Sequence, residues 1–130
     1  MVSLIGTWEN QLGSHLIIEN VTPLNSDEDS KKMGSFFGRY HTAVSSSGQS
    51  LQGTCHGTFR EASNCILISW SVQWQQTKAN GKVKFSVSSW SGQVFDESTI
   101  ETMWLLTSDT DRQSTWRAQN TGKDSFKKVE

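Results

Sequence analysis

The sequence predicts an all-β protein, folded as an eight-stranded antiparallel up-and-down β-barrel. Apolar and polar residues alternate with a period of two along most of the 130 residues, which is the pattern of strands that bury one face. Stretches rich in Asn, Gly and Ser separate these segments at the spacing of an antiparallel meander. No segment longer than a turn or two has the period of a helix, so we expect little helix.

Eight alternating segments follow one another along the chain. The clearest is residues 66–74, where Ile, Trp or Val occupies every second position. In chain order we expect strands at Ile5–Gln11, His15–Val21, Ser35–Val44, Leu51–Phe59, Ile66–Trp74, Val83–Ser91, Thr99–Thr107 and Asp124–Val129. The stretches between them that favour turns include "NQLGS" at 10–14, "SSSGQS" at 45–50, "KANG" at 78–81 and "NTGKD" at 120–124.

Closure of the sheet is expected because eight consecutive antiparallel strands would otherwise leave two unpaired edges. Side chains fill the interior of an eight-stranded barrel, or it holds one small ligand. A β-sandwich is the alternative arrangement. Residues 1–130 fit a single domain with one core, and Trp8 and Trp70 are expected in that core because they lie within apolar alternation.

Charge and composition exclude several classes of partner. The chain has 12 basic and 13 acidic residues, so no basic surface predicts binding to nucleic acid or to a membrane. No apolar run approaches the roughly 18 residues of a membrane span, and the start "MVSLIGTW" lacks the features of a signal peptide. Asn20-Val21-Thr22 matches an N-glycosylation acceptor. The chain is thus expected to be either cytosolic or already processed, and the glycosylation match favours a secreted, extracellular protein with a cytoplasmic location left open.

The cysteines and acidic residues give no clear metal site. Cys55 and Cys65 are too few for a disulfide scaffold or a zinc site without histidines, and Cys55 and His56 would point to opposite faces of a strand. A cross-strand disulfide and two free buried thiols both stay open. The acidic stretch "NSDEDSKK" at 25–32 lacks the ligand spacing of a calcium loop, so we expect a solvated connection there.

Enzyme motifs are absent from the sequence. It contains no nucleophile elbow, phosphate-binding glycine loop or His-x-x-x-His spacing, and His15, His41 and His56 fall on three different predicted strands. The tryptophans indicate binding instead, because Trp74, Trp90, Trp104 and Trp116 each lie beside polar residues. Indoles combined with hydroxyl and amide groups are the usual lining of a small-molecule pocket.

Six segments, in order, resemble the avidins and streptavidin, the family of biotin-binding barrels. They are "GTWENQLGS" at 6–14, "GRYHTAV" at 38–44, "WSVQW" at 70–74, "SSWSGQV" at 88–94, "TMWLLTSD" at 102–109 and "STW" at 114–116 with "GKDSFKKV" at 122–129. The resemblance covers Gly6 to Val129, and all six tryptophans fall at positions where streptavidin has them. It implies non-covalent binding of biotin as a ligand, with no cofactor, no catalytic residue and no metal.

The resemblance also implies a role for each residue of the site. Three donors to the ureido oxygen would be Asn10, Ser14 and Tyr40, and the acceptors for the ureido N–H groups would be Thr42 and Asp124. Ser88 would lie near the ring sulfur, and the carboxylate would be held by Ser86, Ser45, Ser46 and Ser47. The apolar walls would be Trp74, Trp90 and Trp104, with Leu12 and Leu106 nearby. Trp116 would be donated to the pocket of a neighbouring subunit in a homotetramer.

The match departs from the family in the segment after Val44, which is shorter than that of streptavidin and has Ser46 in place of Asn. Avidin's cysteines do not correspond to Cys55 or Cys65, so no disulfide is carried over. Two other functions fit parts of the sequence. A lipocalin-like carrier is an alternative because Gly6-Thr7-Trp8 fits the start of that group, and a carbohydrate-binding lectin is another because exposed Trp stacks on sugars.

Overall fold

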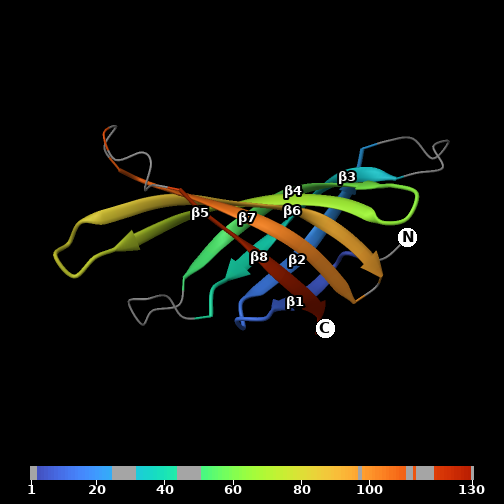
Figure 1. Ribbon diagram of the computed structural model, residues 1–130, viewed down its shortest axis with the longest axis horizontal. Helices are drawn as coiled ribbons and strands as arrows, with labels where there is room; N and C mark the ends of the chain where they lie inside the picture. Colours follow the sequence, from blue (N-terminus) through green and yellow to red (C-terminus); the bar gives the residue numbers. More distant parts are fainter. Residues whose placement is uncertain are drawn as a thin grey trace.

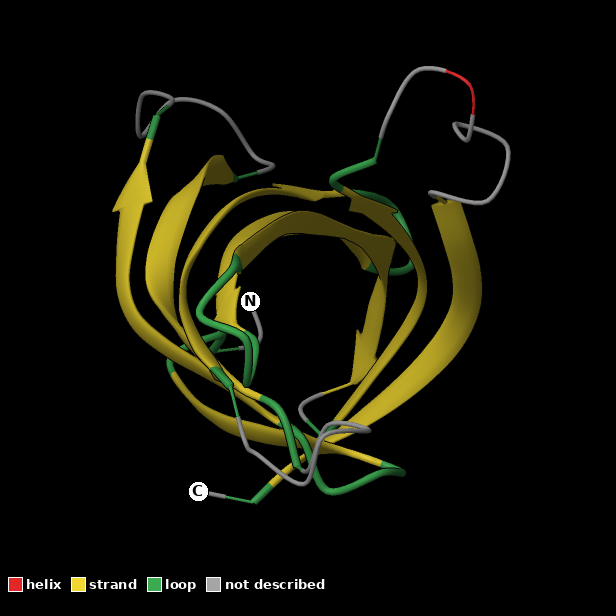
Figure 2. Ribbon diagram, turned by 90° about the vertical axis from the view of Figure 1, so that its left-hand side faces the viewer, coloured by secondary structure: helices red, strands yellow, loops and turns green. Residues whose placement is uncertain are grey.

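Eight antiparallel strands form a closed barrel in the computed structural model, which describes residues 3–24, 32–43, 51–96, 98–110, 113 and 119–129 (Figure 1). The strands are β1 (Gly6–Asn10), β2 (His15–Pro23), β3 (Met33–His41), β4 (Gln52–Glu61), β5 (Ile66–Thr77), β6 (Val83–Asp96), β7 (Thr99–Ser108) and β8 (Gln119–Lys128). Each strand pairs with its neighbours in sequence, and β1 pairs with β8, where Trp8 lies opposite Lys128. This pairing closes the ring that Figure 2 shows. The predicted barrel is confirmed, and the sandwich alternative is wrong.

The predicted strands are all present, and the largest difference is in β8. This strand begins at Gln119 and includes the stretch "NTGKD", for which a turn was expected. Thr121 pairs with Leu105 and Gly122 with Trp104, so the ladder between β7 and β8 continues through these polar residues. A strand is held by its backbone hydrogen bonds, and a stretch without apolar alternation gives no sign of them. The stretch "SSSGQS" lies outside the described residues.

The inward faces of the strands are apolar in one half of the barrel and mixed in the other. Along β6, the inward residues change from Val94 through Trp90 to Ser88 and Ser86. The core comprises Leu4, Trp8, Leu16, Ile18, Phe36, Tyr40, Cys55, Phe59, Ile66, Ile68, Trp70, Val72, Trp74, Trp90, Val94, Ile100 and Phe126. Trp8 and Trp70 are both buried, as predicted. The apolar core thus fills one half of the interior, and the half with polar inward residues is not part of that core.

Both cysteines are free thiols in different environments. Cys55 lies in the core on β4, and burial raises the pKa of its thiol to about 12. Cys65 lies in the turn between β4 and β5 and is partly exposed. The prediction of a disulfide or two buried thiols is therefore corrected: only Cys55 is buried, because Cys65 precedes the strand whose inward face fills the core.

Two further features concern only the described part of the chain. None of its elements is a helix with the length and hydropathy of a membrane span. Within the same residues, no group of three or more His, Cys, Asp or Glu side chains is placed to hold a metal ion.

Candidate functional site

A cavity of about 310 Å³ lies at the polar end of the barrel interior. Its lining contains the predicted residues Asn10, Leu12, Ser14, Tyr40, Thr42, Trp74, Ser86, Ser88, Trp90, Trp104, Leu106 and Asp124. The lining also contains Leu51, Gln76, Lys84 and Ser108, which were not predicted. Ser45, Ser46, Ser47 and Trp116 lie outside the described residues. The cavity is at the small end of the range for ligand pockets, so it suits one compact molecule.

The turn between β1 and β2 fixes the direction of the Asn10 side chain. Its Oδ1 accepts hydrogen bonds from the backbone N–H groups of Leu12, at 3.0 Å, and Ser14, at 2.8 Å. Gly13 permits this tight turn because its φ of 86° lies in the left-handed region, which glycine enters at little cost. With its oxygen used by the turn, Asn10 presents its amide N–H groups, of which one reaches the Tyr40 hydroxyl at 3.4 Å. Asn10 is therefore held as a donor.

Ser14 and Tyr40 are also set up as donors. The Ser14 Oγ accepts the backbone N–H of Ala43 at 3.1 Å, so its hydroxyl acts as a donor, with the Tyr40 oxygen as its partner within the protein. Burial, and after it the Asp124 carboxylate, raises the pKa of Tyr40, so the phenol keeps its proton. Asn10, Ser14 and Tyr40 are only 7%, 8% and 3% exposed. Donors this deeply buried are poorly solvated and favour a ligand oxygen as their partner.

Asp124 provides an acceptor in the same cavity. Its Oδ2 accepts the indole N–H of Trp90 at 3.0 Å, and its Oδ1 accepts the Gln11 amide at 2.9 Å. Gln11 also accepts the backbone N–H of Ser125 at 2.9 Å, so this turn residue binds the β8 backbone on both sides of the carboxylate. Each carboxylate oxygen has more than one lone pair, so Asp124 can accept a further N–H from a ligand. Sequence reasoning missed Gln11, and its position directly after Asn10 was the only signal.

Thr42 is the second predicted acceptor, and its hydroxyl is already engaged. Oγ1 accepts the backbone N–H of Leu51 at 2.8 Å and donates to the Leu51 carbonyl at 3.3 Å. Because its proton points to Leu51, the free lone pair of Thr42 faces any other partner as an acceptor. This pair also brings Leu51 to the edge of the cavity.

Aromatic rings form the walls of the cavity and fix one another. The Trp74 indole donates to Ser88 Oγ at 2.9 Å, which holds the plane of that ring. The Tyr40 ring lies 4.7 Å from Trp90 and edge-on to Trp74 at 5.9 Å, measured between centroids. Trp90 in turn stacks on the core residue Trp70 at 5.4 Å. The walls are therefore rigid before any ligand arrives, which reduces the ordering cost of binding.

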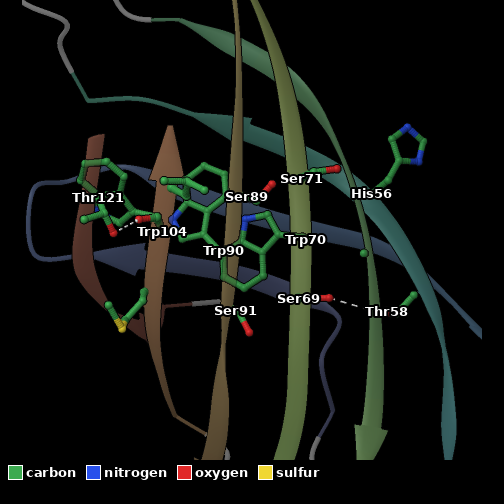
Figure 3. A pocket seen from close by; sticks show the side chains of 13 residues that line it. His56, Thr58, Ser69, Trp70, Ser71, Ser89, Trp90, Ser91, Trp104 and Thr121 are labelled. Atoms are coloured by element: carbon green, nitrogen blue, oxygen red, sulfur yellow. Dashed lines mark hydrogen bonds between the residues drawn. The ribbon is translucent and has the colours of Figure 1, made fainter. Parts of the chain in front are cut away.

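A second and larger hollow, about 690 Å³, lies on the outside of the barrel across β4 to β8. Figure 3 shows the side chains that line this hollow. Thr58 is hydrogen-bonded to Ser69, and the Thr121 hydroxyl donates a hydrogen bond to the Trp104 backbone carbonyl. The serines at 69, 71, 89 and 91 are exposed, and water can satisfy them. The smaller inner cavity is the better candidate site because its donors and acceptors are buried and directed at one space.

The comparisons with known proteins agree with this geometry. The model of the Avidin family matches residues 1–129. The chain belongs to the Avidin family. A crystal structure of Xenavidin has the same fold, with a TM-score of 0.70 and 26% sequence identity over 98% of each chain. The resemblance to the biotin-binding barrels is thus confirmed at the level of family and fold.

Proposed function

We propose that this protein binds biotin in the cavity of the barrel without altering it chemically. The observation that carries the proposal is the set of three buried donors, on Asn10, Ser14 and Tyr40, that face one cavity together with the acceptor Asp124. A ureido group has one carbonyl oxygen, which such donors can share, and two N–H groups, which Asp124 and Thr42 can accept.

The rest of the ligand would fill the remaining lining. The apolar bicycle would pack between Trp74, Trp90 and Trp104, with Leu12 and Leu106 beside it, and the ring sulfur would lie near Ser88. The carboxylate would extend to Ser86 and to the serines at 45, 46 and 47. Family membership and the polar lining support this orientation.

We also propose that the chain is one domain, that it is secreted, and that it assembles as a homotetramer in which Trp116 completes a neighbour's pocket. Support for assembly comes from the outer surface of β6 and β7, where four large apolar side chains are 43–54% exposed: Phe85, Val87, Met103 and Leu105. Contiguous exposed apolar groups on a soluble protein usually mark a contact surface. The charge balance gives no reason to add nucleic acid or membrane as a partner.

Retention on biotin-agarose tests the proposal. The folded protein should be retained and should elute with excess free biotin. Titration of the tryptophan fluorescence with biotin, a fatty acid and simple sugars should give a saturable change with biotin alone. Folded protein that flows through the column and shows no response to biotin would overturn the proposed function.

A further inference from the structure

We propose that Lys84 makes the site selective for ligands that carry a free anionic group at the outer end, so that biotin binds better as the free acid than as an amide. This inference rests on the proposed function and goes beyond it, because it assigns a specificity-determining role to a residue that no resemblance singled out. It concerns the rim of the cavity, where two lining residues lie that the sequence did not predict, Lys84 and Gln76.

Lys84 occupies the outermost inward position of the cavity wall. It has the same parity on β6 as Ser86, Ser88 and Trp90, and it pairs with Gln76 on β5. Ser88 is four positions along the extended strand from Lys84, a rise of about 13 Å. The exposed Lys84 thus lines the outer part of the cavity, whereas Asp124 is buried in its lining.

The charges of the lining are arranged along the length of the cavity. Among the described lining residues, Asp124 and Lys84 are the charged ones. Within the described chain the ammonium of Lys84 has no carboxylate within 4.0 Å, since the ion pairs there are His15 with Glu9 and Arg39 with Glu19. Lys84 is therefore available to a ligand anion.

Asp109 is an acidic residue close to this rim in the fold. Its backbone N–H donates to the Phe85 carbonyl at 2.9 Å, next to Lys84 in the chain. It lines a neighbouring hollow with Phe85 and Thr107, which shares Trp74, Ser86 and Ser108 with the lining of the cavity. Asp109 forms no ion pair with a described residue. Lys84 therefore stays free to meet an anion from the cavity side.

A ligand whose N–H group binds Asp124 projects its other end past Ser86 toward Lys84. A carboxylate at that end is attracted by the ammonium, and a neutral amide in the same place is not. Lys84 is exposed, so water and salt screen the attraction. An exposed ion pair changes affinity by about two- to fivefold, mostly through the dissociation rate.

The test compares Lys84→Gln with Lys82→Gln, which removes the same charge from the exposed turn between β5 and β6, outside the cavity lining. Dissociation rates and affinities are measured for biotin and for its neutral primary amide, at low and at high salt. Lys84→Gln should weaken the binding of biotin about two- to fivefold and leave the amide unchanged. Lys82→Gln should preserve the preference for the acid.

Salt should reproduce the effect of the substitution, because screening removes the attraction that Lys84 supplies. The acid-to-amide preference of the unmodified protein should fall at high salt, and that of Lys84→Gln should not. An unchanged acid-to-amide ratio in Lys84→Gln, with biotin still bound, would overturn this inference alone. A wild-type protein that binds neither compound would overturn the proposed function as well.

Discussion

At the scale of single residues, hydrogen bonds inside the protein decide what each polar group offers a ligand. The Asn10 oxygen is used by two backbone N–H groups of its turn, so its amide becomes a donor. The Ser14 oxygen accepts from Ala43 and so offers its proton. In each group, the oxygen already accepts a hydrogen bond from the protein before the ligand binds. This prearrangement avoids the cost of turning buried polar groups during binding.

Asp124→Ala should weaken biotin binding by about 1.5–3 kcal/mol, the range for a hydrogen bond to a charged group. The substitution removes the acceptor for the ligand and leaves the N–H groups of Gln11 and Trp90 without their present partner. Calorimetry measures the loss. Glu101→Gln is the control, because Glu101 is exposed on β7 and accepts from Ser125. Equal affinities for Asp124→Ala and the wild type would remove Asp124 from the site.

The two thiols should differ in reactivity. Cys55 is fully buried and the pKa of its thiol is raised to about 12, so at pH 8 it stays protonated and shielded. Cys65 is partly exposed in a turn and should react with a thiol reagent. The folded chain should therefore label once, at Cys65, and twice after unfolding. Cys65→Ser should not label until it is unfolded, and rapid labelling of that variant in the folded state would contradict the burial of Cys55.

At the scale of elements, the strands differ in how far the sequence predicts them. β5 shows strict alternation because one of its faces packs in the core, and its prediction needed no further information. The start of β8 shows none, because the positions that share a face with the buried Asp124 are the exposed Asn120 and the partly buried Gly122 rather than apolar residues. The residues of the site likewise divide into those that the sequence predicts and those that it does not. The resemblance supplied its donors and walls, whereas Gln11 and Lys84 depend on tertiary contacts and on the depth of the cavity, which local patterns do not show.

Gly122 couples β8 to the aromatic wall of the cavity. A Cβ at this position would lie 2.5 Å from Cζ2 of the Trp104 indole, which is closer than real atoms approach. Gly122→Ala should therefore displace the Trp104 ring or separate the two strands, and overpacking of this kind costs about 1–3 kcal/mol of the free energy of unfolding. Biotin affinity and tryptophan fluorescence should change together, since Trp104 lines the cavity.

Denaturant unfolding and biotin titration measure both effects of Gly122→Ala. Lys123→Ala is the matched control, because Lys123 is the next residue of β8 and its side chain is exposed. The control should keep stability and affinity close to those of the wild type. A Gly122→Ala variant with unchanged stability and unchanged binding would show that the Trp104 ring has room to move without loss.

At the scale of the whole molecule, the closed barrel leaves two surfaces exposed that association could cover. The cavity opens at the polar end of the interior, and apolar side chains are exposed on the outside of β6 and β7. Each strand of the barrel is paired on both edges within one chain, so association would add burial of these surfaces and no new strand pairing. Closed symmetric assemblies bury such surfaces by pairing identical patches. The proposed tetramer would bury the apolar surface of β6 and β7, and it would also close the cavity if one subunit covers the cavity of the next.

Trp116 is the residue that we expect to cover the neighbouring cavity, and its substitution tests the assembly as a whole. Trp116→Ala should raise the dissociation rate of biotin more than it lowers the association rate, because an apolar cover acts mainly on escape. It should also weaken subunit pairing, and bound biotin should stabilise the assembly by linkage. Light scattering measures the mass, and a chase with excess biotin measures the dissociation rate.

Mixed assemblies separate a contribution within one subunit from a contribution between subunits. Trp116→Ala subunits keep an intact cavity, whereas Asp124→Ala subunits keep Trp116 and bind weakly. When the two variants are refolded together, an Asp124→Ala subunit can supply its Trp116 to the cavity of a Trp116→Ala neighbour. Part of the bound biotin should then leave as slowly as from the wild type. If every cavity of the mixture releases biotin at the fast rate of Trp116→Ala alone, or if Trp116→Ala is a monomer that binds as tightly as the wild type, Trp116 does not act across an interface.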